Sequence, residues 1–144
     1  MELSLPALSD EATTCPCGRA ELVTECCGPI VAGTQIADTA EDLMRSRYTA
    51  FVQATPDAAT HLLRTWHEST RPESIRFAPN RQWRRLRVHS AGGGLLAQAG
   101  HVHFSAAYIQ DGEAATLEEH SIFGRDDQGL WVYVGPRAVS KPSG

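Results

Sequence analysis

The hydrophobic pattern of the chain changes at Trp83-Arg84-Arg85-Leu86-Arg87-Val88-His89-Ser90. Before this stretch, apolar residues recur about every 3.6 positions, which is typical of helices. Within it, Leu86 and Val88 alternate with Arg85, Arg87 and His89, which indicates a strand with one buried face. The sequence therefore predicts that a sheet begins near residue 83 and that helices precede it.

Three further strands are expected after this one. Gly92-Gly93-Gly94 predicts a turn into a strand at 97–110, and Asp111-Gly112 is a strong hairpin signal before a strand at 114–123. A turn at 126–129 then leads to a strand at 130–134. Alternation along the second strand sets apart one face with Val102, Phe104, Ala106 and Tyr108. Along the third strand it sets apart one face with Leu117, Glu119, Ser121 and Phe123.

Two helices are expected before the sheet. Asp38 and Glu41 form a helix start signal, which predicts a first helix over 39–53. Thr55 can cap a second helix that begins at Pro56 and ends near His67. Two helices followed by four strands predict an α+β domain, in which a curved antiparallel sheet wraps a helical layer and leaves a conical cavity.

All the cysteines of the chain lie in one short N-terminal stretch. Cys15-Pro16-Cys17-Gly18 is followed by Cys26-Cys27-Gly28. Four thiolates suit a tetrahedral structural zinc site, which leaves no open position for a catalytic water. Two disulfides with a redox role, or free thiols, are the alternatives. Nothing at the N-terminus resembles a signal peptide, so we expect a reducing, cytoplasmic location, which disfavours disulfides.

Length and composition limit the remaining possibilities. A chain of 144 residues with 42% hydrophobic residues can bury one core of ordinary size beside a small metal knuckle. The formal net charge is -4, which argues against nonspecific binding of nucleic acid. The chain has no apolar run of about 18 residues, so no membrane-spanning helix is expected.

Several motifs resemble known families. The stretch 15–18 together with Cys26-Cys27 resembles the SEC-C zinc knuckle. The stretches 43–51, 65–67, 119–125 and 129–133 resemble motifs of the YchJ family. The resemblance implies an NTF2-like, or cystatin-like, cone and makes the zinc ligands Cys15, Cys17, Cys26 and Cys27. It transfers no catalytic residue.

The composition of the two ends of the chain and the resemblance together predict a domain organisation. We expect a flexible leader at 1–14, a SEC-C zinc knuckle at 15–29, an NTF2-like α+β domain at 38–136 and a disordered tail at 137–144. Glu21 and Glu25 stand between the ligand pairs, where SEC-C knuckles commonly carry lysines. This departure weakens the basic surface that would suit an acidic partner.

The expected function is that of a zinc-binding adaptor or ligand-binding module. A protein partner would contact the knuckle, and a small molecule would bind in the cone. The alternative is a small NTF2-like enzyme, an acid/base lyase, isomerase or hydrolase, with Glu119 or His120 as the base. Arg47 and Glu119 can equally form a buried structural pair. The expected pocket residues are Arg45, Arg47, Tyr48, Trp66, His67, Glu119 and His120.

Two other patterns point to weaker hypotheses. His101-x-His103 has the spacing of two metal ligands on one strand face, and Glu118 or His120 could complete a second metal site. The basic run at 81–87 could follow a phosphate backbone, although a solvated edge strand is the simpler interpretation. Nucleic acid and membranes are therefore not expected as partners.

Overall fold

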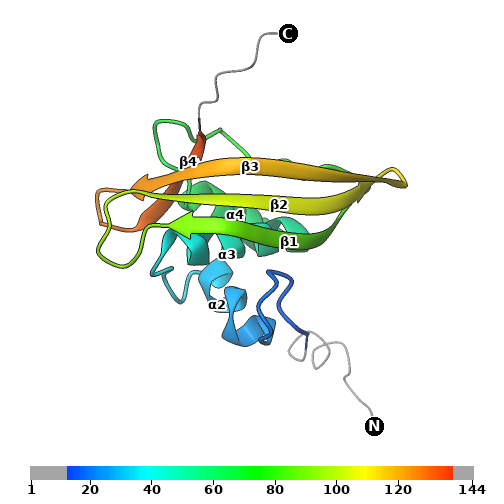
Figure 1. Ribbon diagram of the computed structural model, residues 1–144, viewed down its shortest axis with the longest axis horizontal. Helices are drawn as coiled ribbons and strands as arrows, with labels where there is room; N and C mark the ends of the chain where they lie inside the picture. Colours follow the sequence, from blue (N-terminus) through cyan, green and yellow to red (C-terminus); the bar gives the residue numbers. More distant parts are fainter. Residues whose placement is uncertain (1–12, 138–144) are drawn as a thin grey trace.

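A four-stranded antiparallel sheet forms one layer of the computed structural model, and helices cover one of its faces (Figure 1). The structure describes residues 13–137. Its strands follow one another in the sheet in chain order, as β1 (Arg81–Gly92), β2 (Gly100–Gln110), β3 (Glu113–Arg125) and β4 (Trp131–Pro136). Residues 1–12 of the predicted leader and 138–144 of the predicted tail lie outside the described residues.

The strand boundaries lie within two residues of the prediction except at the start of β2, which is three residues later. The chain between β1 and β2 turns back at residues 94–97, where the Ala97 amide donates to the Gly94 carbonyl at 3.1 Å. The Ala97 carbonyl in turn accepts a hydrogen bond from Arg125 at 2.9 Å. Because the backbone groups of Ala97 bond Gly94 and the side chain of Arg125, Ala97 is not part of the ladder and β2 begins at Gly100.

The helical layer is built from α3 (Ala40–Gln53) and α4 (Pro56–Arg64). The Asp42 amide donates to the Thr39 hydroxyl at 3.0 Å, so Thr39 caps the N-terminus of α3. The prediction that Asp38 provides the start signal of this helix is wrong. The Ala58 amide donates to Thr55 at 3.1 Å, which confirms the predicted cap of α4.

The second helix ends earlier than predicted because the chain joins the edge of the sheet. Instead of continuing to His67, α4 stops at Arg64. The Tyr133 amide of β4 then donates to the Thr65 carbonyl at 2.7 Å, and the His67 amide donates to the Tyr133 carbonyl at 2.8 Å. Trp66 thus forms a parallel bridge with Tyr133, which competes with a further helical turn.

A short helix that the sequence did not predict follows the cysteines. After the 3₁₀ turn η1 (Val23–Glu25), α2 (Cys27–Ala32) begins within the second cysteine pair. Pro29 occupies its third position, where a backbone N–H has no partner inside the helix in any case. Gly33 ends α2 at a φ of 85°.

The main core lies between α3 and the concave face of the sheet. Leu43, Met44 and Tyr48 of α3 pack against a row of buried sheet residues formed by Leu86, Val102, Phe104, Ala106, Phe123 and Trp131. A second cluster joins Val31 of α2 to Ala50, Ala58 and Leu62. The predicted alternation of β2 is confirmed from Val102 to Ala106, where the alternate side chains face this core. No helix in residues 13–137 is both long and apolar enough to cross a bilayer.

His61 is a buried histidine that links α3 and α4. Arg64 donates to His61 Nδ1 at 2.8 Å, so the proton lies on Nε2, which contacts the Ser46 hydroxyl at 2.9 Å. Burial, with the nearby charges of Arg64 and Arg47, lowers the pKa of His61 to about 3. The folded protein therefore keeps this imidazole neutral.

We expect this histidine to make stability fall as the pH falls. The unfolded chain takes up a proton on His61 below pH ~6.5, whereas the folded chain resists protonation until about pH 3. Between pH 7 and pH 5, His61 should therefore remove about 1–2 kcal/mol from the free energy of unfolding. Denaturant titration at both pH values, with zinc kept in excess, measures the loss. His61→Gln should reduce the pH dependence and His67→Gln should not; equal slopes in all three proteins would contradict the assignment.

Candidate functional site

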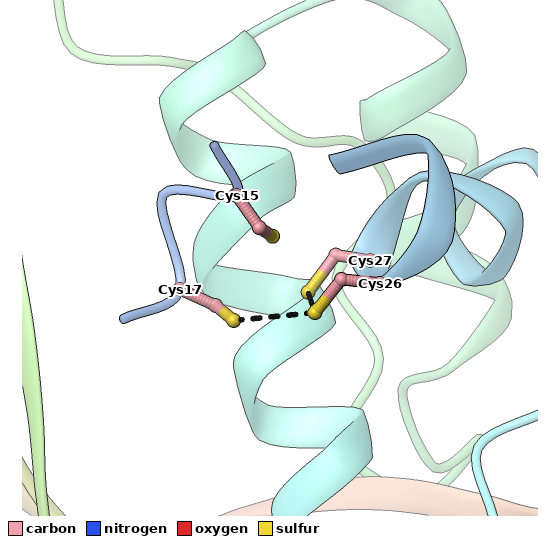
Figure 2. Close-up of side chains that lie close together, drawn as sticks. All are labelled: Cys15, Cys17, Cys26 and Cys27. Carbon is pink, nitrogen blue, oxygen red and sulfur yellow. Dashed lines mark hydrogen bonds between the residues drawn. The ribbon is translucent and has the colours of Figure 1, made fainter. Parts of the chain in front are cut away.

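The four cysteine side chains converge beside α3 (Figure 2). Cys15 and Cys17 lie on a loop, Cys26 precedes α2, and Cys27 is its first residue. The loop is closed by a hydrogen bond from the Cys15 amide to the Glu21 carbonyl at 2.7 Å and by pairing of Thr14 with Leu22. The end of the predicted leader is therefore docked onto the cysteine loop.

The spacing of the sulfur atoms fits a tetrahedral ion. All four Sγ atoms lie within 4.8 Å of one another, with Cys17 to Cys26 at 3.6 Å and Cys26 to Cys27 at 4.0 Å. Zinc–sulfur bonds of about 2.3 Å would place neighbouring sulfurs about 3.8 Å apart. Cys15, Cys17 and Cys27 are buried, and all four thiols are free. The donor set thus suits zinc, with every position taken by protein.

The thiols perturb one another electrostatically. Hydrogen bonds from Cys17 and Cys27 lower the pKa of Cys15. Burial, followed by hydrogen bonding and repulsion from Cys17, raises the pKa of Cys26 to about 12. The pKa of Cys27 is raised by its hydrogen bonds with Cys15 and Cys17 and by burial. Without a cation, one thiol of the cluster ionises easily, and its negative charge makes ionisation of the neighbouring thiols harder.

Helix α3 supports the cysteine cluster with polar side chains. Arg45 donates to the Cys17 carbonyl at 2.6 Å and pairs with Glu41 at 2.8 Å. The Thr49 hydroxyl lies 3.7 Å from Cys15 Sγ. Arg19 of the loop pairs with Asp42 at 2.8 Å. These contacts fix the loop to α3 between Glu41 and Thr49.

A separate cavity of about 240 Å³ lies between α3 and the sheet. Its wall is largely aromatic and apolar, with polar groups on one side. The lining residues are Met44, Arg47, Tyr48, Phe51, Trp66, Arg81, Trp83, Phe104, Ala106, Leu117, Glu119, Ser121 and Tyr133.

The polar side of this pocket centres on Arg47. Its Nη1 atom donates to the Leu62 carbonyl at 2.9 Å and to the Thr65 hydroxyl at 2.8 Å. Its guanidinium carbon lies 5.0 Å from the Trp66 ring centroid and 4.7 Å from that of Tyr133. Burial lowers the pKa of Arg47 to about 10, so it stays charged at neutral pH.

Glu119 is held by neighbouring hydroxyl groups. Tyr133 and Ser121 each donate to its Oε2 atom at 2.7 Å. Burial and the hydrogen bond to Glu119 raise the pKa of Tyr133. The expected direct pair between Arg47 and Glu119 is not among the ion pairs of the described residues. Tyr133 connects the two instead, since its ring lies against the guanidinium and its hydroxyl bonds the carboxylate.

The predicted pocket residues divide into two groups. The structure brings together Arg47, Tyr48, Trp66 and Glu119. The placement of Arg45, His67 and His120 in the pocket is wrong. Arg45 lies at the cysteine loop, and His67 lines a separate hollow near Arg71 and Asp126. His120 pairs with His103 in the ladder, whereas Glu119 pairs with Phe104, so the two neighbours point to opposite faces.

Sequence reasoning missed three polar residues of the pocket, of which Arg81 belongs to the basic run at 81–87. Ser121 shares the inward face of β3 with Glu119, and the alternation already placed it there. Tyr133 comes from β4, whose register carries a bulge between Ile122 and Phe123 of its partner strand. A short strand with an irregular register offers no alternation long enough to assign Tyr133 to the concave face.

Comparisons with known proteins agree with this architecture. A family described as "YchJ, middle NTF2-like domain" matches residues 39–136. A UPF0225 protein of Streptomyces coelicolor is 46% identical over 120 residues, which cover 83% of this chain and 90% of that protein. A UPF0225 protein of Xanthomonas campestris is 42% identical over 126 residues, which cover 85% and 93% respectively.

Two solved structures share the fold. The solution structure of a SEC-C motif containing protein from Rhodopseudomonas palustris has a TM-score of 0.75 at 27% identity. The match covers 89% of this chain and 100% of the Rhodopseudomonas chain. The crystal structure of a SEC-C motif containing protein from Psychrobacter arcticus has a TM-score of 0.72 at 23% identity, with coverages of 94% and 88%. The predicted α+β, NTF2-like fold class is thus confirmed.

Proposed function

The chain belongs to the YchJ family, and from this premise we propose that it is a binding module in which one structural zinc ion secures the N-terminal loop and the cone holds a small molecule. The proposal has two parts that can be tested separately. One concerns the four cysteines, and the other concerns the cavity behind α3.

The zinc assignment is supported by the donor set. Cys15, Cys17, Cys26 and Cys27 present four sulfurs within 4.8 Å of one another. Bound zinc would cross-link the loop to α2 and, with no free coordination position, would supply no catalytic chemistry. A cytoplasmic location, which we also propose, would keep these thiols reduced. The likeness to a SEC-C motif containing protein points the same way.

The ligand assignment is carried by one observation: a cavity of about 240 Å³ with aromatic walls keeps polar groups available on one side. Glu119 uses Oε2 for both of its hydrogen bonds, and no hydrogen bond within residues 13–137 reaches its Oε1. The indole Nε1 of Trp66 is buried without a partner in the same part of the chain. A small, mostly apolar molecule with one donor and one acceptor would suit these groups.

Filling the cavity should abolish binding of an apolar probe. Ala106 is 1% exposed and lines the pocket, so Ala106→Phe should occupy much of the space. We expect saturable fluorescence enhancement of anilinonaphthalene sulfonate by the wild-type protein, and affinity weakened by at least about tenfold in Ala106→Phe. Fluorescence titration measures both affinities.

Ala107→Phe is the matched control for this experiment. Ala107 is the next residue of β2, and it pairs with Arg85 and Thr116 on the opposite face of the sheet. The control should therefore bind the dye as the wild-type protein does. Equal loss in both variants, or no saturable binding by the wild type, would contradict a ligand pocket in the cone.

An acid/base enzyme is the second candidate, favoured by the position of Glu119 inside an apolar pocket. In such an enzyme, Glu119 would be the base, and His120 could not replace it because it lies on the other face. A molecule recovered from the purified protein would distinguish the two functions. A binding module returns it unchanged after incubation, whereas an enzyme converts it and Glu119→Gln stops the conversion.

We also propose that the knuckle contacts a protein partner. Leu22 is 37% exposed where the cysteine loop closes against Thr14, and the exposed residues Glu21 and Glu25 lie near it in the sequence. An apolar side chain between two carboxylates would suit a partner with a basic rim around a small apolar hollow.

A further inference from the structure

The convex face of the sheet carries a row of three imidazoles. His89, His103 and His120 come from β1, β2 and β3, which are neighbours in the sheet. The ring centroids of His89 and His103 are 4.7 Å apart, and those of His103 and His120 are 3.8 Å apart with the rings nearly parallel, at 10°. The row lies on the face opposite to the pocket.

The strand register explains why a carboxylate joins this row. His103 lies directly opposite His120 in the ladder, and Ser105 lies opposite Glu118. Glu118 and His120 share one face of β3 because they are two residues apart. Glu118 is therefore the diagonal neighbour of His103, and its Oε2 atom lies 2.6 Å from His103 Nε2.

We propose that His103, Glu118 and His120 form a second metal site, which binds a divalent transition-metal ion such as Zn²⁺ on the convex face of the sheet. Each residue offers one ligand atom, and these three atoms lie within 4.8 Å of one another. Two imidazole nitrogens and a carboxylate oxygen around one tetrahedral zinc ion would lie about 3.3–3.6 Å apart, given metal–ligand bonds of about 2.0–2.2 Å. Because the rings of His103 and His120 are stacked nearly parallel, they must turn out of the stack for both nitrogens to point at one ion.

The exposure of the three side chains makes such rotations easy. Glu118 and His120 are exposed and His103 is half-buried, so no core packing opposes the movement. Binding would replace the hydrogen bond between His103 and Glu118 with two metal bonds. His89 is a neighbour rather than a ligand, because its ring nitrogens do not join the three ligand atoms that lie within 4.8 Å of one another.

This second site would differ from the cysteine site in chemistry. Three protein ligands leave coordination positions open to water or to a small anion, whereas four thiolates leave none. Its nitrogen and oxygen donors suit Zn²⁺, Ni²⁺ and Cu²⁺, and the ion would exchange with the solvent. The protein would then hold one closed, structural ion and one open, exchangeable ion.

Counting zinc at equilibrium tests the proposal on the full chain. Wild-type protein, His103→Ala, His120→Ala and His101→Ala are dialysed against buffered free Zn²⁺, and zinc per chain is measured by elemental analysis across a range of free concentrations. We expect two zinc ions per wild-type chain. His103→Ala and His120→Ala should each weaken the affinity for the second zinc ion by at least about tenfold. Even the loss of a residue that only supports a metal ligand costs about 10–100-fold in metal affinity.

His101→Ala is the matched control because His101 is an exposed histidine on the same face of β2, two residues before His103. It should retain both ions. A wild-type protein that never exceeds the zinc content of the cysteine site, or a loss in His101→Ala equal to that in His120→Ala, would overturn the proposal. Cys26→Ser should lower the content by one ion independently of the histidines, so failure of one site does not imitate failure of the other.

Discussion

Replacement of Cys26 by serine is expected to release zinc from the cysteine site and to lower the free energy of unfolding by at least about 4 kcal/mol. Cys26 is the least buried of the four cysteines, so a serine at this position has little cost of its own. Its Sγ atom nevertheless lies near both Cys17 and Cys27. A large loss of stability would therefore report the metal rather than the packing of one side chain.

The measurement combines elemental analysis with thermal unfolding of the purified protein. Glu21→Gln is the control, because Glu21 is an exposed side chain on the loop between the two ligand pairs. It should keep both the zinc content and the stability of the wild type. Unchanged zinc in Cys26→Ser would remove this residue from the ligand set. Chelation of the wild-type protein should reproduce the lower stability of the variant, and stability that ignores the chelator would mean that zinc does not secure the fold.

Replacement of Arg47 by methionine is expected to destabilise the fold by about 3–5 kcal/mol. Methionine keeps an apolar stem of similar length, so the change removes mainly the guanidinium. The Leu62 carbonyl and the Thr65 hydroxyl would lose a charged donor, at about 1–3 kcal/mol each. The rings of Trp66 and Tyr133 would lose a cation that lies 5.0 Å and 4.7 Å from their respective centroids.

Two further variants make this result specific. Arg81→Met removes an exposed arginine that also lines the pocket, and it should cost less than about 1 kcal/mol. Arg47→Lys keeps the charge without the planar fork, so its stability should fall between those of the wild type and Arg47→Met. Denaturant titration gives all three values. If Arg47→Met is as stable as Arg81→Met, Arg47 has no structural role and its charge is free to bind a ligand.

The sheet was predictable because alternation repeats over many residues. β2 and β3 are 11 and 13 residues long, so the period of two is unambiguous and places Phe104, Ala106 and Glu119 on the concave face. The same rule shows why Glu119 and His120 cannot serve one pocket. Their grouping followed proximity in the sequence, and in a strand adjacent residues face opposite sides.

Short and irregular segments were not predictable from pattern. α2 has six residues, too few to show a helical period, and it contains Gly28 and Pro29, which disfavour helix in sequence-based prediction. The early end of α4 depends on the bridge between Trp66 and Tyr133 of β4, two residues that are 67 positions apart in the chain. Such long-range pairing competes with local helix signals and leaves no local trace. The four cysteines needed no such information, because both ligand pairs lie within residues 15–27 of the chain.

Helix α3 is enclosed on more than one side. Five consecutive residues from Ser46 to Ala50 are buried. Because five residues make more than one full turn, this part of α3 has no face exposed to solvent. Tyr48 faces the sheet, Ala50 meets Val31 of α2, and Thr49 meets Cys15. A fragment of residues 39–136, the segment that matches the family, would therefore lack α2 and the cysteine loop, which cover one side of α3. The smallest fragment worth expressing on its own has to begin before the first cysteine.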